Sequence, residues 1–186
     1  MIDSEIQEVR QERLRGQIDK FFEKWKQGMQ FQSEFNRSGN IFFTGWQTDP
    51  DKVMSEVIDE FIAADHISSA PGSQIYNNEN FTHEDLEMVK PYIKTKGDQL
   101  MDEIIEETKH NFEVYMQDHP GYKASDSGMR KVWEEKKDEY IKFVINNFQK
   151  GRMHVHPDDR NLYQLSRENL EFLAPRVEEF LTELYK

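Results

Sequence analysis

Residues 91–118 read PYIKTKGDQLMDEIIEETKHNFEVYMQD, and this stretch decides the fold class. With about 100° of rotation per residue in an α-helix, its side chains separate into two arcs. The core-facing arc consists of Ile93, Leu100, Met101, Ile104, Ile105, Thr108, Phe112 and Tyr115. The opposite arc consists of Asp98, Asp102, Glu103, Glu106, Glu107, His110 and Glu113. The sequence therefore predicts a long amphipathic helix with an acidic outer face.

Helical spacing also dominates the chain before this stretch. Apolar residues at intervals of three and four predict a helix over about residues 4–28. Asp49 can accept a backbone N–H bond as an N-cap, and Pro50 suits a first helical position. We therefore expect a second helix over about residues 50–65.

The remaining segments predict further helices. Thr82 and Asp85 resemble a capping box, with Asp in place of the usual Glu. In the last third, the apolar spacing predicts a helix over 125–150 that Gly151 ends, and Ser166 is the expected cap of a final helix. The count comes to about six helices.

Residues 31–46 fall outside the helical rhythm. Their aromatic and apolar side chains are interrupted by Gly39 and Gly45, which favours a small strand or an aromatic loop near 39–47. Because there is one strand candidate, we expect no sheet of any size. The predicted fold is therefore all-α: one domain over residues 1–186, built as an irregular antiparallel helical bundle with this small β or loop excursion.

The charge of the chain is confined to its middle. Residues 41–119 contain 17 Asp or Glu and 5 Lys or Arg, which alone gives the net charge of −12, because both flanks are balanced. A charge confined to one stretch produces a local field that can steer and orient a basic partner. The acidic excess argues against direct nucleic-acid binding, which relies on Lys and Arg at phosphates.

Composition and missing motifs exclude several classes of function. The chain has no cysteine, so it has no disulfide, thiolate metal site or cysteine nucleophile, and we expect a cytoplasmic protein. Its first residues are polar and acidic and no apolar run approaches membrane-spanning length, so neither a secretory signal nor a membrane partner is expected. Gly-x-Ser-x-Gly and phosphate-binding glycine motifs do not occur. We expect no cofactor and favour a non-enzyme.

Two sets of side chains are candidate partner contacts, because interfaces often combine aromatic anchors with a charged rim. The acidic set is Asp98, Asp102, Glu103, Glu106 and Glu107, and the aromatic set is Phe42, Phe43 and Trp46. Each set has an ordinary structural alternative. Acidic arcs of helices usually face water, and the aromatic segment is better interpreted as a plug over the helical core than as a partner contact.

Histidines supply weaker candidates for a metal site. Glu107 and His110 have the Glu-x-x-His spacing of bundles that hold paired metals, but they lie on the arc opposite the apolar one. His154 and His156, with Asp158, would place two rings on one side of a strand. A polar connection between helices is the favoured interpretation of this second group.

The sequence thus favours a non-catalytic acidic interaction or regulatory protein, of the inhibitor, immunity-factor or adaptor type. It would bind a basic protein surface, and its carboxylates would mimic phosphates if the partner is a nucleic-acid enzyme. One alternative is a metal-dependent enzyme or metal-binding helical protein that uses His, Glu and Asp ligands. Another is a small-molecule sensor with an aromatic cavity. A homodimer also stays open, because an apolar stripe does not specify what covers it.

Overall fold

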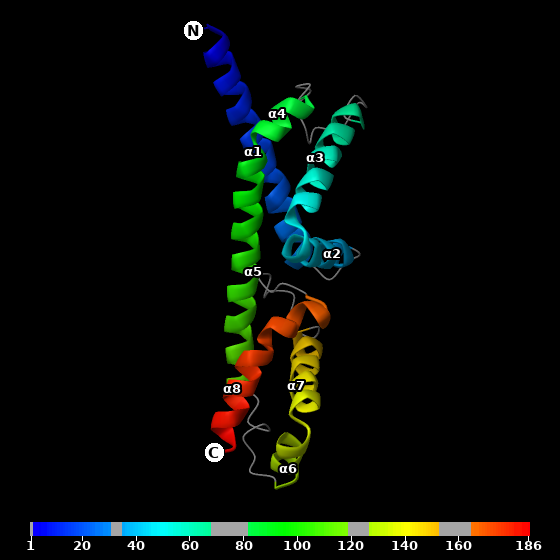
Figure 1. The fold of residues 1–186 in the computed structure, drawn as a ribbon, viewed down its shortest axis with the longest axis vertical. Helices are drawn as coiled ribbons and strands as arrows, with labels where there is room; N and C mark the ends of the chain where they lie inside the picture. The colour runs from blue at the N-terminus through cyan, green and yellow to red at the C-terminus, as the bar shows by residue number, and fades with distance from the viewer. Residues whose placement is uncertain (1, 31–34, 68–81, 119–126, 153–164) are drawn as a thin grey trace. The chain divides into compact units, whose positions relative to one another are not determined.

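The protein is helical throughout the part that its computed structural model describes, which is residues 2–30, 35–67, 82–118, 127–152 and 165–186 (Figure 1). These ranges contain no strand, so the all-α class is confirmed. The elements are α1 (Ile2–Gln30), α2 (Phe35–Thr48), α3 (Pro50–Ile67), α4 (His83–Met88), α5 (Lys90–Asp118), α6 (Ser127–Glu135), α7 (Lys137–Arg152), the 3-10 helix η2 (Glu168–Leu173) and α8 (Ala174–Leu184).

The chain forms two compact units, each with its own core. Unit 1 consists of Met1–Gln27 and Ile41–Asp102, and unit 2 of Gly28–Asn40 and Glu103–Lys186. Helix α5 contributes its first half to unit 1 and its second half to unit 2. That the whole chain acts as one domain stays a prediction.

Two helix starts follow the chemistry expected from the sequence. The backbone N–H of Lys52 donates to Asp49 Oδ1 at 3.1 Å, and α3 begins at Pro50 as predicted. At α4, the backbone N–H of Asp85 donates to Thr82 Oγ1, while the Thr82 N–H donates to the Asp85 carboxylate. The capping box is therefore confirmed, with Asp85 performing the role that Glu usually has.

The expected β or loop excursion near 39–47 is wrong, because α2 covers this region. Gly45 does not break the helix. It leaves room for a neighbour, since a Cβ atom at Gly45 would lie 2.9 Å from Val53 Cγ2 of α3. The glycine that suggested a loop instead permits close packing of two consecutive helices.

The helix expected over 125–150 is two helices. α6 ends at Glu135 and α7 begins at Lys137 and continues past Gly151 to Arg152. The interruption is slight, because the Lys136 N–H donates to the Val132 carbonyl at 2.8 Å. With the α2 segment, this division raises the count above the expected six helices. Neither glycine nor proline stands at the interruption, so the sequence contains no signal for it.

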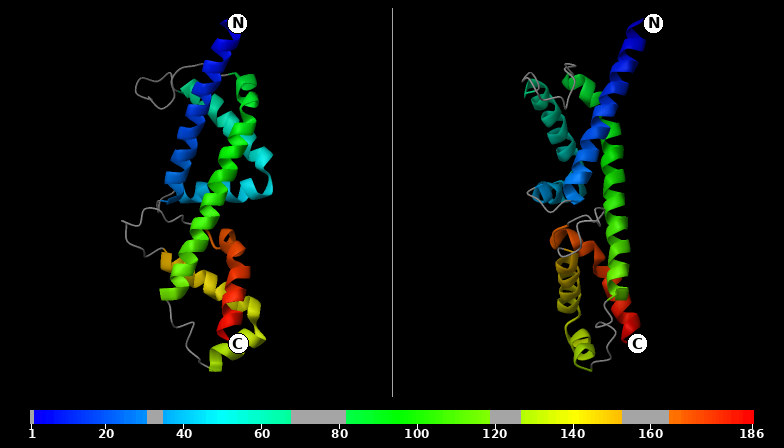
Figure 2. Two further views of the ribbon diagram at one scale, coloured as in Figure 1. Left: turned by 90° about the vertical axis from the view of Figure 1, so that its left-hand side faces the viewer. Right: turned by 180° about the vertical axis from the view of Figure 1, so that it is seen from behind.

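The core of unit 1 joins α1, α2, α3, α4 and the first half of α5. Its buried side chains are Leu14, Ile18, Phe21, Phe22, Phe42, Phe43, Trp46, Val53, Met54, Val57, Ile58, Leu86, Val89, Ile93, Leu100 and Met101. Figure 2 shows α1 beside this half of α5 from two further sides. At the edge of that contact, Asp19 Oδ1 accepts from the Tyr92 hydroxyl at 2.6 Å and pairs with Lys96 Nζ at 3.1 Å.

The indole of Trp46 lies directly on the backbone of α5 at Gly97. A Cβ atom at Gly97 would lie only 2.0 Å from the Trp46 ring. Trp46 is itself buried and packs against Phe22 and Phe42. The ring therefore has little freedom to move aside, and any side chain at position 97 has to push the two helices apart.

We expect Gly97→Ala to destabilise unit 1 by about 1–3 kcal/mol, the usual cost of overpacking a closed core. Urea unfolding measures this effect. Gly16→Ala is the matched control, because a Cβ at Gly16 meets nothing within 4 Å and its helix gains about 0.5–1 kcal/mol from the alanine. Equal changes in the free energy of unfolding for the two substitutions would contradict the close packing of Trp46 on Gly97.

The core of unit 2 joins the second half of α5 with α7, η2 and α8. Phe112 of α5 packs edge to face on Phe148 of α7, with their ring centres 5.3 Å apart. Arg176 of α8 donates to Glu113 of α5 through two nitrogens, and the second bond, from Nη2 to Oε2, is 3.1 Å long. Figure 2 shows α8 beside this half of α5. The arginine bonds hold the pKa of the Glu113 carboxyl below its usual value.

A polar side chain, that of Thr108, is buried in the core of unit 2. Thr108 is fully buried on α5, and among the described residues its hydroxyl has no hydrogen-bond partner. A buried hydroxyl without a partner costs free energy because it has given up its bonds to water.

We expect Thr108→Val to stabilise unit 2 by about 1 kcal/mol, because valine has nearly the same shape and no group to desolvate. The free energy of unfolding in urea checks this. Thr95→Val on the same helix is the control, because the exposed Thr95 hydroxyl donates to the Pro91 carbonyl at 3.0 Å and its removal gains nothing. A loss of stability in Thr108→Val would mean that the hydroxyl has a partner.

Within the described residues, no helix combines the length and the apolar character that crossing a membrane requires.

Candidate functional site

The acidic face of α5 is the candidate site that the sequence predicts. Asp98 and Asp102 belong to the half of α5 in unit 1, and Glu103, Glu106 and Glu107 to the half in unit 2. Four of these side chains are exposed and Glu107 is half-buried. The arc is therefore on the outside of each unit, opposite the buried apolar arc.

Asp98 is engaged in the structure of unit 1. Its Oδ1 accepts from Trp46 Nε1 at 3.0 Å, and its Oδ2 accepts from Lys94 Nζ at 2.6 Å. These two bonds, that from Lys94 first, hold the pKa of the Asp98 carboxyl below its usual value. The carboxylate thus fixes a core tryptophan and is only partly available to a partner.

The pH dependence of stability should report this role. A carboxyl whose pKa is lowered on folding stabilises the folded state above its unfolded pKa and loses that effect as the pH falls through the folded pKa. We expect Asp98→Asn to cost about 0.2–1 kcal/mol at neutral pH and to lose less stability than the wild type between about pH 6 and about pH 2. Urea unfolding at several pH values checks this.

Asp102→Asn, one turn further along the exposed face of α5, is the matched control and should keep the acid sensitivity of the wild type. An Asp98→Asn variant with the full acid sensitivity would contradict the assigned bonds.

The other acidic residues of the face differ in the bonds that they make within the chain. Glu106 Oε1 accepts from Lys109 Nζ at 2.9 Å, an exposed pair that contributes little to stability. Glu103 and Glu107 also interact within the chain. Asp102 is exposed on the turn after Asp98. Asp102 and Glu106 are therefore the carboxylates of this face that a partner could reach at least structural cost.

The aromatic set lies in the core rather than at the surface. Phe42, Phe43 and Trp46 are all buried in unit 1. Phe42 packs against Phe22 and Trp25 of α1, with its ring centre 4.6 Å from that of Trp25. The structure thus buries these rings in the core of unit 1, but on a helix and not on the non-helical plug that the sequence favoured. Of the two candidate sets, the acidic one contains the exposed side chains.

The metal candidates are not brought together in the described part of the chain. His110 is exposed on α5, and within the described residues no three His, Asp or Glu side chains lie close enough to hold a metal ion. His154, His156 and Asp158 lie outside the described residues. The metal-site alternative stays a prediction for those three.

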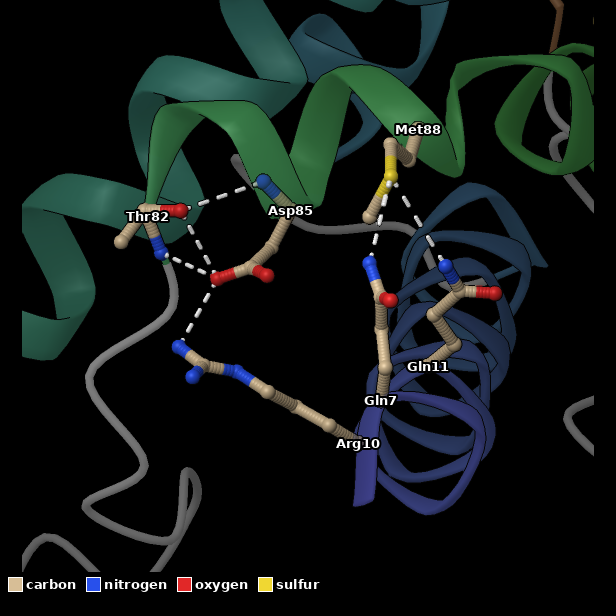
Figure 3. A network of polar contacts seen from close by, with 6 residues as sticks. All are labelled: Gln7, Arg10, Gln11, Thr82, Asp85 and Met88. Atoms are coloured by element: carbon tan, nitrogen blue, oxygen red, sulfur yellow. Dashed lines mark hydrogen bonds and ion pairs between the residues drawn. The ribbon is translucent and has the colours of Figure 1, made fainter. Parts of the chain in front are cut away.

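A polar network between α1 and α4 is a feature that sequence reasoning missed (Figure 3). Arg10 Nη2 donates to Asp85 Oδ2 at 2.8 Å, and the same oxygen accepts from the N–H and the hydroxyl of Thr82, each at 2.8 Å. One carboxylate oxygen therefore closes the capping box and ties α4 to α1. The sequence did contain one signal for this contact. Arg10 lies four residues before the buried Leu14, so it is on the face of α1 that packs against the rest of unit 1.

The same face of α1 meets the end of α4 through a sulfur atom. Gln7 Nε2 and Gln11 Nε2 lie 3.9 and 3.8 Å from the Met88 sulfur and donate to it from consecutive turns of α1. In Figure 3 both amides point toward this sulfur. The arrangement places two neutral donors around a weak acceptor at the surface of unit 1.

The chain matches no protein-family model, no curated protein and no solved structure.

Proposed function

We propose that this protein is a non-catalytic interaction protein of the cytoplasm that binds a basic surface of another protein through the acidic face of α5. It acts in the manner of an inhibitor, immunity factor or adaptor. If its partner is a nucleic-acid enzyme, the carboxylates take the places of phosphates on the basic surface of that enzyme.

The observation that carries this proposal is the confinement of charge together with its exposure. The net charge of −12 arises within residues 41–119, and Asp102, Glu103 and Glu106 are exposed in that stretch. Like charges one turn apart on a helix face, such as Asp102 and Glu106, repel one another, which costs the folded state some free energy. A basic partner removes this repulsion when it binds.

Helix α3 adds to the negative field of unit 1. It contains five Asp or Glu residues and one Lys. Asp51, Glu56 and Asp59 are exposed, and Lys52 pairs loosely with Glu56 at 3.9 Å. A field of this kind increases the rate of encounter with a basic partner more than it increases the final affinity.

Because Asp98 is hydrogen-bonded within unit 1, it is not a suitable residue to change in a binding test. Reversing its charge would break the bonds to Trp46 and Lys94, so lost binding could not be separated from lost structure. Asp102 and Glu106 avoid this difficulty, because neither is tied to the core.

The test uses the protein that co-purifies with the full chain from its native cell, and measures association by surface plasmon resonance. We expect a basic partner whose association rate falls at least about tenfold between about 50 and about 300 mM salt. The double variant Asp102→Lys with Glu106→Lys should associate at least about tenfold more slowly at low salt.

Glu171→Lys with Glu183→Lys is the matched control, because it makes the same change in charge at exposed positions outside residues 41–119. This control should associate nearly as fast as the wild type. A partner that binds equally at both salt concentrations, or that is weakened equally by both double variants, would remove the proposal.

A further inference from the structure

The surroundings of Met88 differ from those of an ordinary surface methionine. The side chain lies at the end of α4, and the residue keeps 43% of its surface exposed. Its sulfur is nevertheless approached by the amide groups of Gln7 and Gln11 (Figure 3). A thioether is a weak acceptor, so the energy of these contacts does not explain why two amides converge there.

The geometry fits an oxygen atom placed on the sulfur. The donor nitrogens lie 3.8 and 3.9 Å from the sulfur. An oxygen bonded to the sulfur and lying between the two amides is off each S···N line. It therefore shortens each separation by less than a full bond length, into the range of about 2.7–3.2 Å that N–H···O bonds prefer. Gln7 and Gln11 are one helical turn apart, so one oxygen between them can accept from both.

We propose that Met88 is a site of reversible oxidation whose sulfoxide is held by Gln7 and Gln11. The oxidant is a peroxide. A lone pair of the sulfur attacks one oxygen of hydrogen peroxide, and the S–O bond forms as the O–O bond breaks. The second oxygen leaves as hydroxide, takes the proton from the oxygen now bound to sulfur, and becomes water. The sulfur loses two electrons and the peroxide gains them, and reduction by methionine sulfoxide reductases reverses the change.

Exposure distinguishes Met88 from the other methionines whose burial the structure describes, among which Met129 is half-buried. Met54, Met101 and Met116 are each 5% exposed or less. Peroxide reaches an exposed thioether much faster than a buried one. Unlike the core residues Met54, Met101 and Met116, Met88 would place its sulfoxide oxygen beside hydrogen-bond donors.

The expected consequence is opposite to the usual one. Methionine oxidation commonly loosens a structure, because it places a polar atom among apolar neighbours. At Met88 the new oxygen would accept two amide bonds from α1, which strengthens the contact between α1 and α4. This contact already contains the pair between Arg10 and Asp85, so oxidation reinforces an existing junction.

The experiment treats the full chain with hydrogen peroxide and follows each methionine by peptide mass spectrometry. Met88 should gain one oxygen before Met54, Met101 and Met116. Amide hydrogen exchange over residues 83–89 then measures the opening of α4. We expect oxidation to slow this exchange about threefold or more in the wild type, since each hydrogen bond changes an opening constant by about two- to tenfold.

Three variants make the result specific. Met88→Leu keeps the apolar contact but cannot be oxidised, so peroxide should leave its exchange over residues 83–89 unchanged. Gln7→Ala with Gln11→Ala should lose the slowing, whereas Gln17→Ala, on the same helix, should keep it. Oxidation of Met88 no faster than that of the buried methionines, or an effect on exchange that does not depend on Gln7 and Gln11, would overturn the proposal.

Discussion

The close packing of Trp46 against α5 at Gly97 is the constraint on which the core of unit 1 depends. The ring occupies the space that a side chain at Gly97 would need, and its Nε1 donates to Asp98 in the following position of the helix. This single ring fixes α2 against α5, and its contacts with Phe22 extend the packing to α1. Because the indole is buried and its N–H is satisfied, a rotation of α2 about its axis would break this hydrogen bond as well as the ring packing.

The same interaction joins the fold to the charged surface. Asp98 belongs to the acidic face by its sequence position, but its two oxygens serve Trp46 and Lys94. Counting charges along the sequence could locate the acidic stretch, because charge is a property of composition. It could not show which of the carboxylates support the structure, because the bond of Asp98 to Trp46 joins residues 52 positions apart in the sequence.

Periodicity predicted much of the fold and failed where side-chain size mattered. The apolar arc of α5 was correct for the buried Ile93, Leu100 and Phe112, because burial follows the helical repeat directly. Gly45 was misread as a break, although Phe42, Phe43 and Trp46 have the spacing of a helix face. A glycine in a sequence marks either a turn or a close approach, and only the position of Val53 distinguishes these two cases. The division at Lys136 had no signal in the sequence.

The shared oxygen of Asp85 has a consequence for how unit 1 loosens. It accepts from the Thr82 backbone, the Thr82 hydroxyl and Arg10, so the first turn of the six-residue helix α4 and its attachment to α1 use the same acceptor. A helix this short has almost no stability in isolation. Fraying of α4 and its detachment from α1 are therefore a single cooperative event, and the two segments open and close together as one small folding unit.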